Sequence, residues 1–186
     1  LQPTPTDAVK SVLKRQSRLP ESNLNEVKNI QVQGANGMIP ARVYTPNGPG
    51  PFPVVVYYHG GGFVIADNDV YDATPRALAE STDSIFVSVE YRRAPEYKFP
   101  AAHDDAYQAY KWVVENAASF NGDPKRVAVA GESAGANLAI NVSIAARNEE
   151  FQMPLHQLLV YPVAGMDMNS FSYKENANAK PLNKPM

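Results

Sequence analysis

Gly131-Glu132-Ser133-Ala134-Gly135 stands between a short β-branched run at 126–130 and a stretch at 134–146 that contains no charged residue. The first flank predicts a buried strand, and the second predicts a helix covered on nearly every side. A serine at such a junction is held in a strained conformation with its side chain exposed, because glycines two residues away on each side let the chain bend sharply. The stretch therefore predicts a nucleophile, Ser133, on a strand-to-helix turn.

The composition is that of one globular domain, or a large part of one. The chain has 186 residues, of which 44% are hydrophobic and 19% charged. Its net charge of -2 gives no electrostatic reason to expect nucleic acid or an acidic membrane as a partner. The absence of cysteine excludes disulfides, thiolate metal sites and a cysteine nucleophile.

No apolar run reaches the length of a membrane span, and the first residues contain no signal-like segment. We therefore expect no membrane span. A cytoplasmic location is favoured, and a secreted or periplasmic one stays open because a removed signal peptide leaves no trace in the sequence.

Strands and helices alternate along most of the chain. Residues 27–32 and 38–44 alternate apolar and polar side chains around Gly34-Ala35-Asn36-Gly37, which predicts an antiparallel hairpin. Further strands are predicted at 54–58, 85–89, 126–130 and 157–161, and helices from Thr74, from Pro100 and from Ala134. Such alternation predicts an α/β fold with a mostly parallel sheet, helices on both faces and a site at the carboxyl ends of the strands.

Three regions follow from this pattern. Residues 1–26 read as an N-terminal lid or cap-like segment, with a helix on the outside of the domain as an equal alternative. Residues 27–165 form the α/β core. Residues 166–186 are polar and lack clear periodicity, so we expect a loop or tail of a cap region there.

His59-Gly60-Gly61-Gly62-Phe63 follows the predicted strand that ends at Tyr58. Consecutive glycines leave backbone NH groups free and let a substrate approach closely. Such a loop suits a negatively charged oxygen, which forms when a serine attacks an ester carbonyl. A flexible hinge is the alternative interpretation.

Three more motifs occur in order along the chain: Tyr91-Arg92-Arg93-Ala94-Pro95-Glu96, Phe99-Pro100-Ala101-Ala102 and Asn137-Leu138-Ala139. With the glycine loop and the serine turn, they make the chain from about residue 27 onward resemble the N-terminal part of hormone-sensitive-lipase-type (bacterial family IV) carboxylesterases of the α/β-hydrolase fold. The chain departs from that family's usual pattern in carrying Glu132 in place of Asp and Ala136 in place of Gly.

The resemblance implies that Ser133 is the nucleophile and that the NH groups of Gly61, Gly62 and Ala134 form the oxyanion hole. No metal or cofactor is required by that chemistry. His59 would position the loop and would not act as the base. The resemblance implies supporting roles for four residues: His59, Gly131, Glu132 and Gly135.

A base for the serine is harder to find. In this fold the order along the chain is serine, acid, histidine. Two histidines precede the serine, and His156 lies before the strand 157–161, at the end of the sheet opposite the site. Asp167 stands at the correct strand end for an acid, whereas the resemblance implies an acid and a histidine beyond residue 186. We therefore expect a fragment, incomplete at the C-terminal side of its sheet and inactive alone, with a complementary C-terminal segment of the same protein as its partner.

The remaining charged motifs receive structural interpretations. Asp104 and Asp105 near the start of the helix from Pro100 read as first-turn carboxylates favoured by the helix dipole. Arg92 and Arg93 read as residues of segment packing or surface pairing.

The function predicted is hydrolysis of short to medium acyl esters through an acyl-enzyme. The alternative is a non-catalytic, receptor-like protein that binds a small molecule on the same fold. A small-molecule ester is the expected substrate, and a homodimer stays open.

Overall fold

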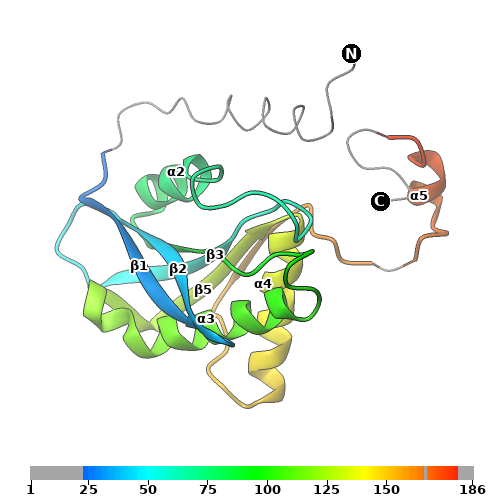
Figure 1. Cartoon of the computed structure of the whole chain (residues 1–186). Helices are drawn as coiled ribbons and strands as arrows, with labels where there is room; N and C mark the ends of the chain where they lie inside the picture. Colours follow the sequence, from blue (N-terminus) through cyan, green and yellow to red (C-terminus); the bar gives the residue numbers. More distant parts are fainter. Residues whose placement is uncertain (1–22, 166, 180–186) are drawn as a thin grey trace.

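The computed structural model describes residues 23–165 and 167–179 (Figure 1). The lid-like segment predicted over residues 1–26 therefore lies almost entirely outside the described residues. Within the described part, six strands form one sheet in the order β1-β2-β4-β3-β5-β6. The strands are β1 (Glu26–Gly34), β2 (Gly37–Thr45), β3 (Phe52–Tyr58), β4 (Ile85–Val89), β5 (Gly122–Glu132) and β6 (Gln157–Val160).

The predicted hairpin is confirmed. β1 and β2 pair antiparallel, with Gly34 opposite Gly37 at the turn, and β2 joins the rest of the sheet antiparallel to β4. Alternating exposure near the turn, with Val32 and Gly34 buried and their neighbours exposed, gives the hairpin one solvated face.

The remaining pairs are parallel. β3 pairs with both β4 and β5, and β5 pairs with β6. Every residue of β4 is buried, as its mostly apolar sequence predicts for a strand covered on both faces, and the one polar residue, Ser88, is buried with the rest. The carboxyl ends of β3 and β5 lie side by side, since Tyr58 is the register partner of Gly131.

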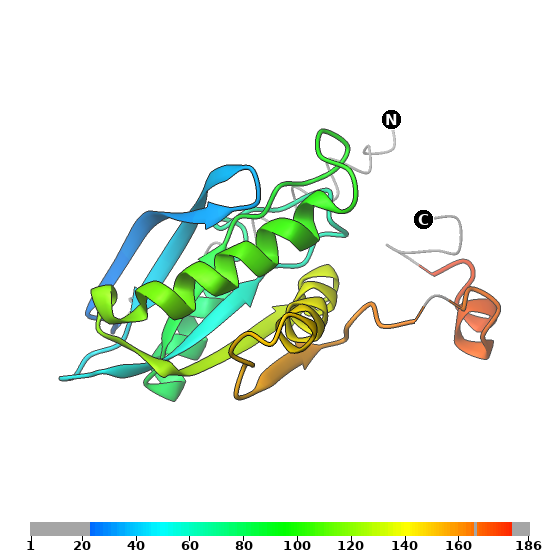
Figure 2. The ribbon, with the colours of Figure 1, turned by 90° about the horizontal axis from the view of Figure 1, so that it is seen from below.

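Helices cover both faces of the sheet, which confirms the predicted α/β architecture (Figures 1 and 2). α2 (Ala73–Thr82) packs on one face, where Ala79 meets a small cluster of buried residues from the strands. α3 (Ala101–Asn116), a single turn η1 (Ala117–Phe120) and α4 (Ala134–Asn148) pack on the other face over the main core.

The last part of the sheet is open. β6 forms its edge, and Leu158 and Val160 are 41% and 38% exposed. Beyond it, the predicted polar tail contains a short helix, α5 (Phe171–Glu175), whose Ser170 side chain accepts from the Tyr173 NH group. The sequence of these five residues showed no helical periodicity, so the helix was not predicted. α5 stands apart from the sheet in both views (Figure 2).

The first-turn interpretation of the paired aspartates holds for Asp104 alone. Asp105 is fully buried and accepts from the Arg92 guanidinium at 2.7 and 2.8 Å, as well as from the NH groups of Arg92 and Ala35. Asp105 therefore ties the hairpin turn and the segment after β4 to α3. Sequence periodicity does not reveal such an anchor, because its partners lie far along the chain.

Candidate active site

Ser133 occupies a single-residue turn between β5 and α4. Its φ of 55° and ψ of −115° place a non-glycine residue in the left-handed half of the map, at a cost on the order of 1–3 kcal/mol. The Ser133 NH group donates to the carbonyl of Val160 at 2.9 Å, and its carbonyl accepts from the Asn137 NH group at 3.2 Å. The strained conformation is thus held from both sides, by β6 and by the first turn of α4.

The flanking glycines are required by close backbone approach. A Cβ atom on Gly131 would lie 2.7 Å from the backbone nitrogen of Ala136 and nearer still to the carbonyl of Gly135. A Cβ atom on Gly135 would collide with the carbonyl of Tyr58 at the end of β3 and lie 2.5 Å from that of His59. α4 therefore starts in direct contact with the backbone that leads into the glycine loop.

The glycine loop makes a tight turn beside the serine. Gly61 and Gly62 have φ values of 111° and 62°, and the Gly61 carbonyl accepts from the NH groups of Val64 and Ile65 at 3.1 and 3.0 Å. Among residues 23–165 and 167–179, no group accepts a hydrogen bond from the NH of Gly61 or Gly62. As the first residue of α4, Ala134 likewise has an NH group with no acceptor within its helix.

His59 is sealed inside the protein. It is 0% exposed, its Nδ1 lies 2.7 Å from the Gly60 carbonyl, and its ring stacks on Tyr91 with centroids 4.4 Å apart. Burial lowers its pKa to about 4, so the ring is neutral near pH 7. The Tyr91 hydroxyl also donates to the His59 carbonyl at 2.7 Å. Its occupied Nδ1 and low pKa make His59 unsuited to act as a base.

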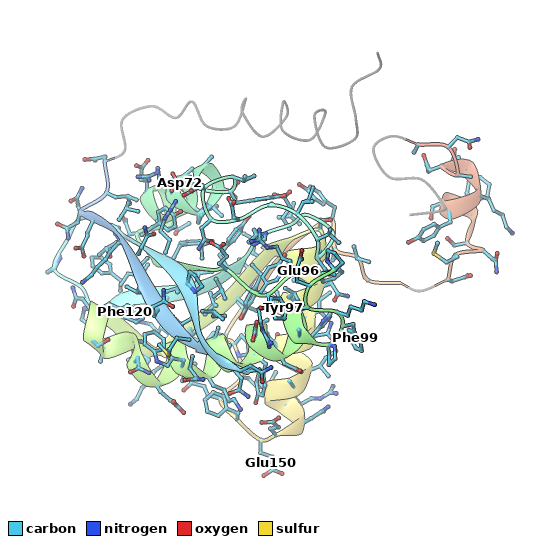
Figure 3. All side chains as sticks on the ribbon, in the orientation of Figure 1. Asp72, Glu96, Tyr97, Phe99, Phe120 and Glu150 are labelled. Carbon is cyan, nitrogen blue, oxygen red and sulfur yellow. The ribbon has the colours of Figure 1, made fainter. Side chains whose placement is uncertain are left out.

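His103 lies closer to the serine helix than its sequence position suggests. Its Nε2 is 3.0 Å from Oδ1 of Asn137, one turn beyond Ser133, and its ring stacks on Phe63 of the glycine loop at 5.5 Å. Phe99, which lies just before the start of α3 (Figure 3), packs T-shaped against the same ring at 5.2 Å. Asn137 lies in one of the family motifs, but no sequence signal connects it to His103.

The two candidates after the serine do not reach it by any contact that the structure provides. The His156 carbonyl accepts from the Val129 NH group, and the β5–β6 register pairs Val129 with Gln157, at the opposite end of these strands from the serine. Asp167 accepts from the NH group of Asn169 at 2.9 Å and so caps its own turn. The described residues include no cluster of His, Asp and Glu that could hold a metal ion.

A hollow of about 450 Å³ lies elsewhere, between the hairpin and the loop that precedes α2. Its charged lining comes from Arg42, Asp67, Asp69 and Glu90. It includes neither the serine nor the glycine loop, so it is not the site of this chemistry.

The fold and this arrangement of turn and loop agree with a match to a known family. A family model described as the alpha/beta hydrolase fold matches residues 55–186, which is more than half of the chain. The chain belongs to this family, and within it to the hormone-sensitive-lipase-type group that its motifs resemble.

Individual relatives are esterases. The chain is 42% identical over 174 residues to carboxylesterase NlhH of Mycobacterium tuberculosis, covering 91% of this chain and 54% of the relative. It is 32% identical over 154 residues to an arylesterase of Saccharolobus solfataricus, covering 83% of this chain and 50% of that protein.

Solved structures agree with the fold. The thermostable carboxylesterase EstE1 from a metagenomic library superposes with a TM-score of 0.88 at 40% identity, covering 98% of this chain and 64% of that one. An esterase of Pyrobaculum calidifontis superposes with a TM-score of 0.84 at 39% identity, covering 92% of this chain and 56% of that one. The chain spans about half the length of the curated relatives it matches. In the part that the structure describes, no helix is long and apolar enough to cross a membrane.

Proposed function

We propose that the protein is a carboxylic ester hydrolase that acts on short to medium acyl esters through Ser133. The observation that carries the proposal is the strained Ser133 turn beside a glycine loop whose Gly61 and Gly62 NH groups have no acceptor among the described residues. Esterase activity in relatives that are 32–42% identical supports the same chemistry.

The reaction follows from these groups. The Ser133 hydroxyl oxygen attacks the ester carbonyl carbon while a histidine takes its proton. The resulting oxyanion accepts hydrogen bonds from the NH groups of Gly61, Gly62 and Ala134. The histidine returns the proton to the departing alcohol, and water then hydrolyses the acyl-enzyme by the same steps. Removing one donor from such an oxyanion hole lowers turnover by about 10²–10³-fold, so the geometry of the loop contributes strongly to the rate.

The base and its acid are assigned to a complementary C-terminal segment of the same protein. Two observations support this assignment. The match covers only 54% of carboxylesterase NlhH, and β6 leaves an apolar edge on which Leu158 and Val160 are 41% and 38% exposed. An open apolar edge strand is a template for further pairing. The segment would add strands to β6 and bring its histidine to the carboxyl ends of the strands.

Intact mass measurement of an active preparation tests this assignment. We expect either a longer chain or residues 1–186 together with a second peptide. A single active species of 20.3 kDa would refute it. The cytoplasmic location and the homodimer stay predictions from the sequence, which cell fractionation and sedimentation would measure.

Hydrolysis of p-nitrophenyl esters of increasing acyl length tests the function itself. The complete protein should hydrolyse the shorter esters, and Ser133→Ala should lower turnover by at least about 10⁴-fold. A protein that binds these esters without turnover would instead support the receptor-like alternative.

A further inference from the structure

A tyrosine outside the predicted site contacts the residue before the nucleophile. The hydroxyl of Tyr71 donates to Oε1 of Glu132 at 3.1 Å. Glu132 is the last residue of β5, and Tyr71 lies in the loop before α2, 61 positions away along the chain. The hydrogen bond therefore joins the serine turn to a separate element.

The same hydroxyl lies close to Gly60, the first glycine of the glycine loop. A Cβ atom on Gly60 would lie 2.6 Å from the Tyr71 hydroxyl oxygen and 3.1 Å from the Glu132 carbonyl. The Tyr71 and His59 ring centroids are 5.6 Å apart. Gly60 is thus enclosed by the tyrosine on one side and by the serine turn on the other, with no room for a methyl group.

Asp72, the residue after Tyr71, is held in place by several hydrogen bonds. Its carboxylate accepts hydrogen bonds from Arg42 at 3.0 Å, from Arg76 at 2.8 Å and from the Tyr44 hydroxyl at 2.9 Å. Burial alone would raise the pKa of Asp72, but these hydrogen bonds outweigh it and lower that pKa, so the carboxylate stays charged. Figure 3 shows Asp72 beside α2. The chain at Tyr71 is therefore anchored through Asp72 to the sheet and to α2.

The donor state of the phenols is also set by the surroundings. Burial and the nearby Glu132 carboxylate raise the pKa of Tyr71, so its hydroxyl keeps its proton near neutral pH. The same two causes raise the pKa of Tyr161, the residue after β6, to about 12. Two protonated phenols, Tyr71 and Tyr161, therefore lie near the Glu132 carboxylate.

We propose that Tyr71 is a positioning residue: its hydrogen bond to Glu132 clamps the glycine loop at Gly60 against the serine turn. The clamp fixes the NH groups of Gly61 and Gly62 at a constant distance from Ser133. The inference rests on the proposed esterase function, because it concerns the geometry of the same oxyanion hole. It also gives a reason for Glu at this position, since an Asp side chain is one carbon shorter and falls short of the phenol.

The chain offers a matched control. The Tyr107 hydroxyl donates to Oε2 of Glu149, also at 3.1 Å and also part-buried, but Glu149 caps the far end of α4 from Ser133. Figure 3 shows Glu150 at that far end, well away from Tyr97 and Phe99 in the loop before α3. Tyr107→Phe therefore removes an equivalent hydrogen bond from a place without contact to the loop.

Ester hydrolysis by the complete protein gives the first readout. We expect Tyr71→Phe to lower kcat by about 10- to 100-fold with KM within about twofold of the original, because a displacement of about 1 Å costs up to 10²-fold. Glu132→Asp should behave alike, and Tyr71→Phe combined with Glu132→Asp should be no worse than either change alone. Tyr107→Phe should leave kcat unchanged. Equal kcat values for Tyr71→Phe and Tyr107→Phe would overturn the clamp.

Amide hydrogen exchange over residues 59–66 gives a second readout that does not depend on activity. Tyr71→Phe should speed exchange in this loop at least several-fold, whereas Tyr107→Phe should not. Absence of hydrolysis by the unmutated protein would refute the proposed function, and the exchange comparison would then decide the clamp on its own. Unchanged exchange in Tyr71→Phe would refute the clamp even if the esterase is confirmed.

Discussion

Replacement of Gly135 by alanine tests whether close backbone approach sets the geometry of the serine turn. The added Cβ would lie 2.5 Å from the His59 carbonyl oxygen and even nearer to that of Tyr58. Real Cβ atoms are not found closer than 3.0 Å to a neighbouring atom, so α4 must move away from these carbonyls by more than about 0.5 Å, the difference between 3.0 and 2.5 Å. Both neighbours are backbone atoms of β3 and its loop, which cannot rotate away as a side chain would.

The retreat has two measurable consequences. Overpacking of this kind destabilises by about 1–3 kcal/mol, and a shift of Ser133 approaching 1 Å lowers turnover by about 10²-fold. Thermal unfolding and p-nitrophenyl ester hydrolysis by the complete protein measure the two effects. Gly165→Ala is the control, because a Cβ atom there meets open space. A Gly135→Ala protein with the turnover and melting temperature of Gly165→Ala would refute the steric account.

Three further predictions concern buried or strained residues. Asp105→Ala leaves the Arg92 guanidinium without its carboxylate partner. Calorimetry should show a free energy of unfolding lower by about 3–5 kcal/mol and a melting temperature lower by on the order of 10 °C. An unchanged melting temperature would contradict the anchoring role of Asp105. Burial lowers the pKa of His59 from 6.5 to about 4, so between these pH values the unfolded state binds more protons than the folded state. The free energy of unfolding should therefore fall by up to about 3 kcal/mol as the pH drops from 6.5 to 4. An NMR titration that shows His59 charged at about pH 6 would contradict this. Because Ser133 has a positive φ, Ser133→Gly should be more stable than Ser133→Ala by about 1 kcal/mol in denaturant unfolding, and the reverse order would argue against the strained turn.

The strands and helices of the core were predictable because their apolar periodicity is strong. The mostly apolar residues 85–89 and the uncharged stretch 134–146 each correspond to a buried element, and only Ile144 in the latter is exposed. The turn itself was predictable because few residue types tolerate its backbone. In α5 a single helical turn capped by Ser170 leaves too short a pattern to detect.

The contacts that position the candidate site were harder to predict. Tyr71 and Glu132 are 61 residues apart, and nothing in their local sequence marks them as partners. Asp105 was misjudged for the same reason, since a carboxylate near a helix start satisfies a local rule while its true partner, Arg92, belongs to another segment. Local sequence thus locates the reacting serine, whereas the hydrogen bonds that hold its surroundings in place depend on the tertiary fold.

Covalent labelling by a fluorophosphonate tests the central claim most directly, because the reagent reacts with an activated serine. Peptide mass mapping of the complete, folded protein should place the label on Ser133, and Ser133→Ala should abolish it. A folded complete protein that resists labelling, or that carries the label on another serine, would contradict the assignment of Ser133 as the nucleophile.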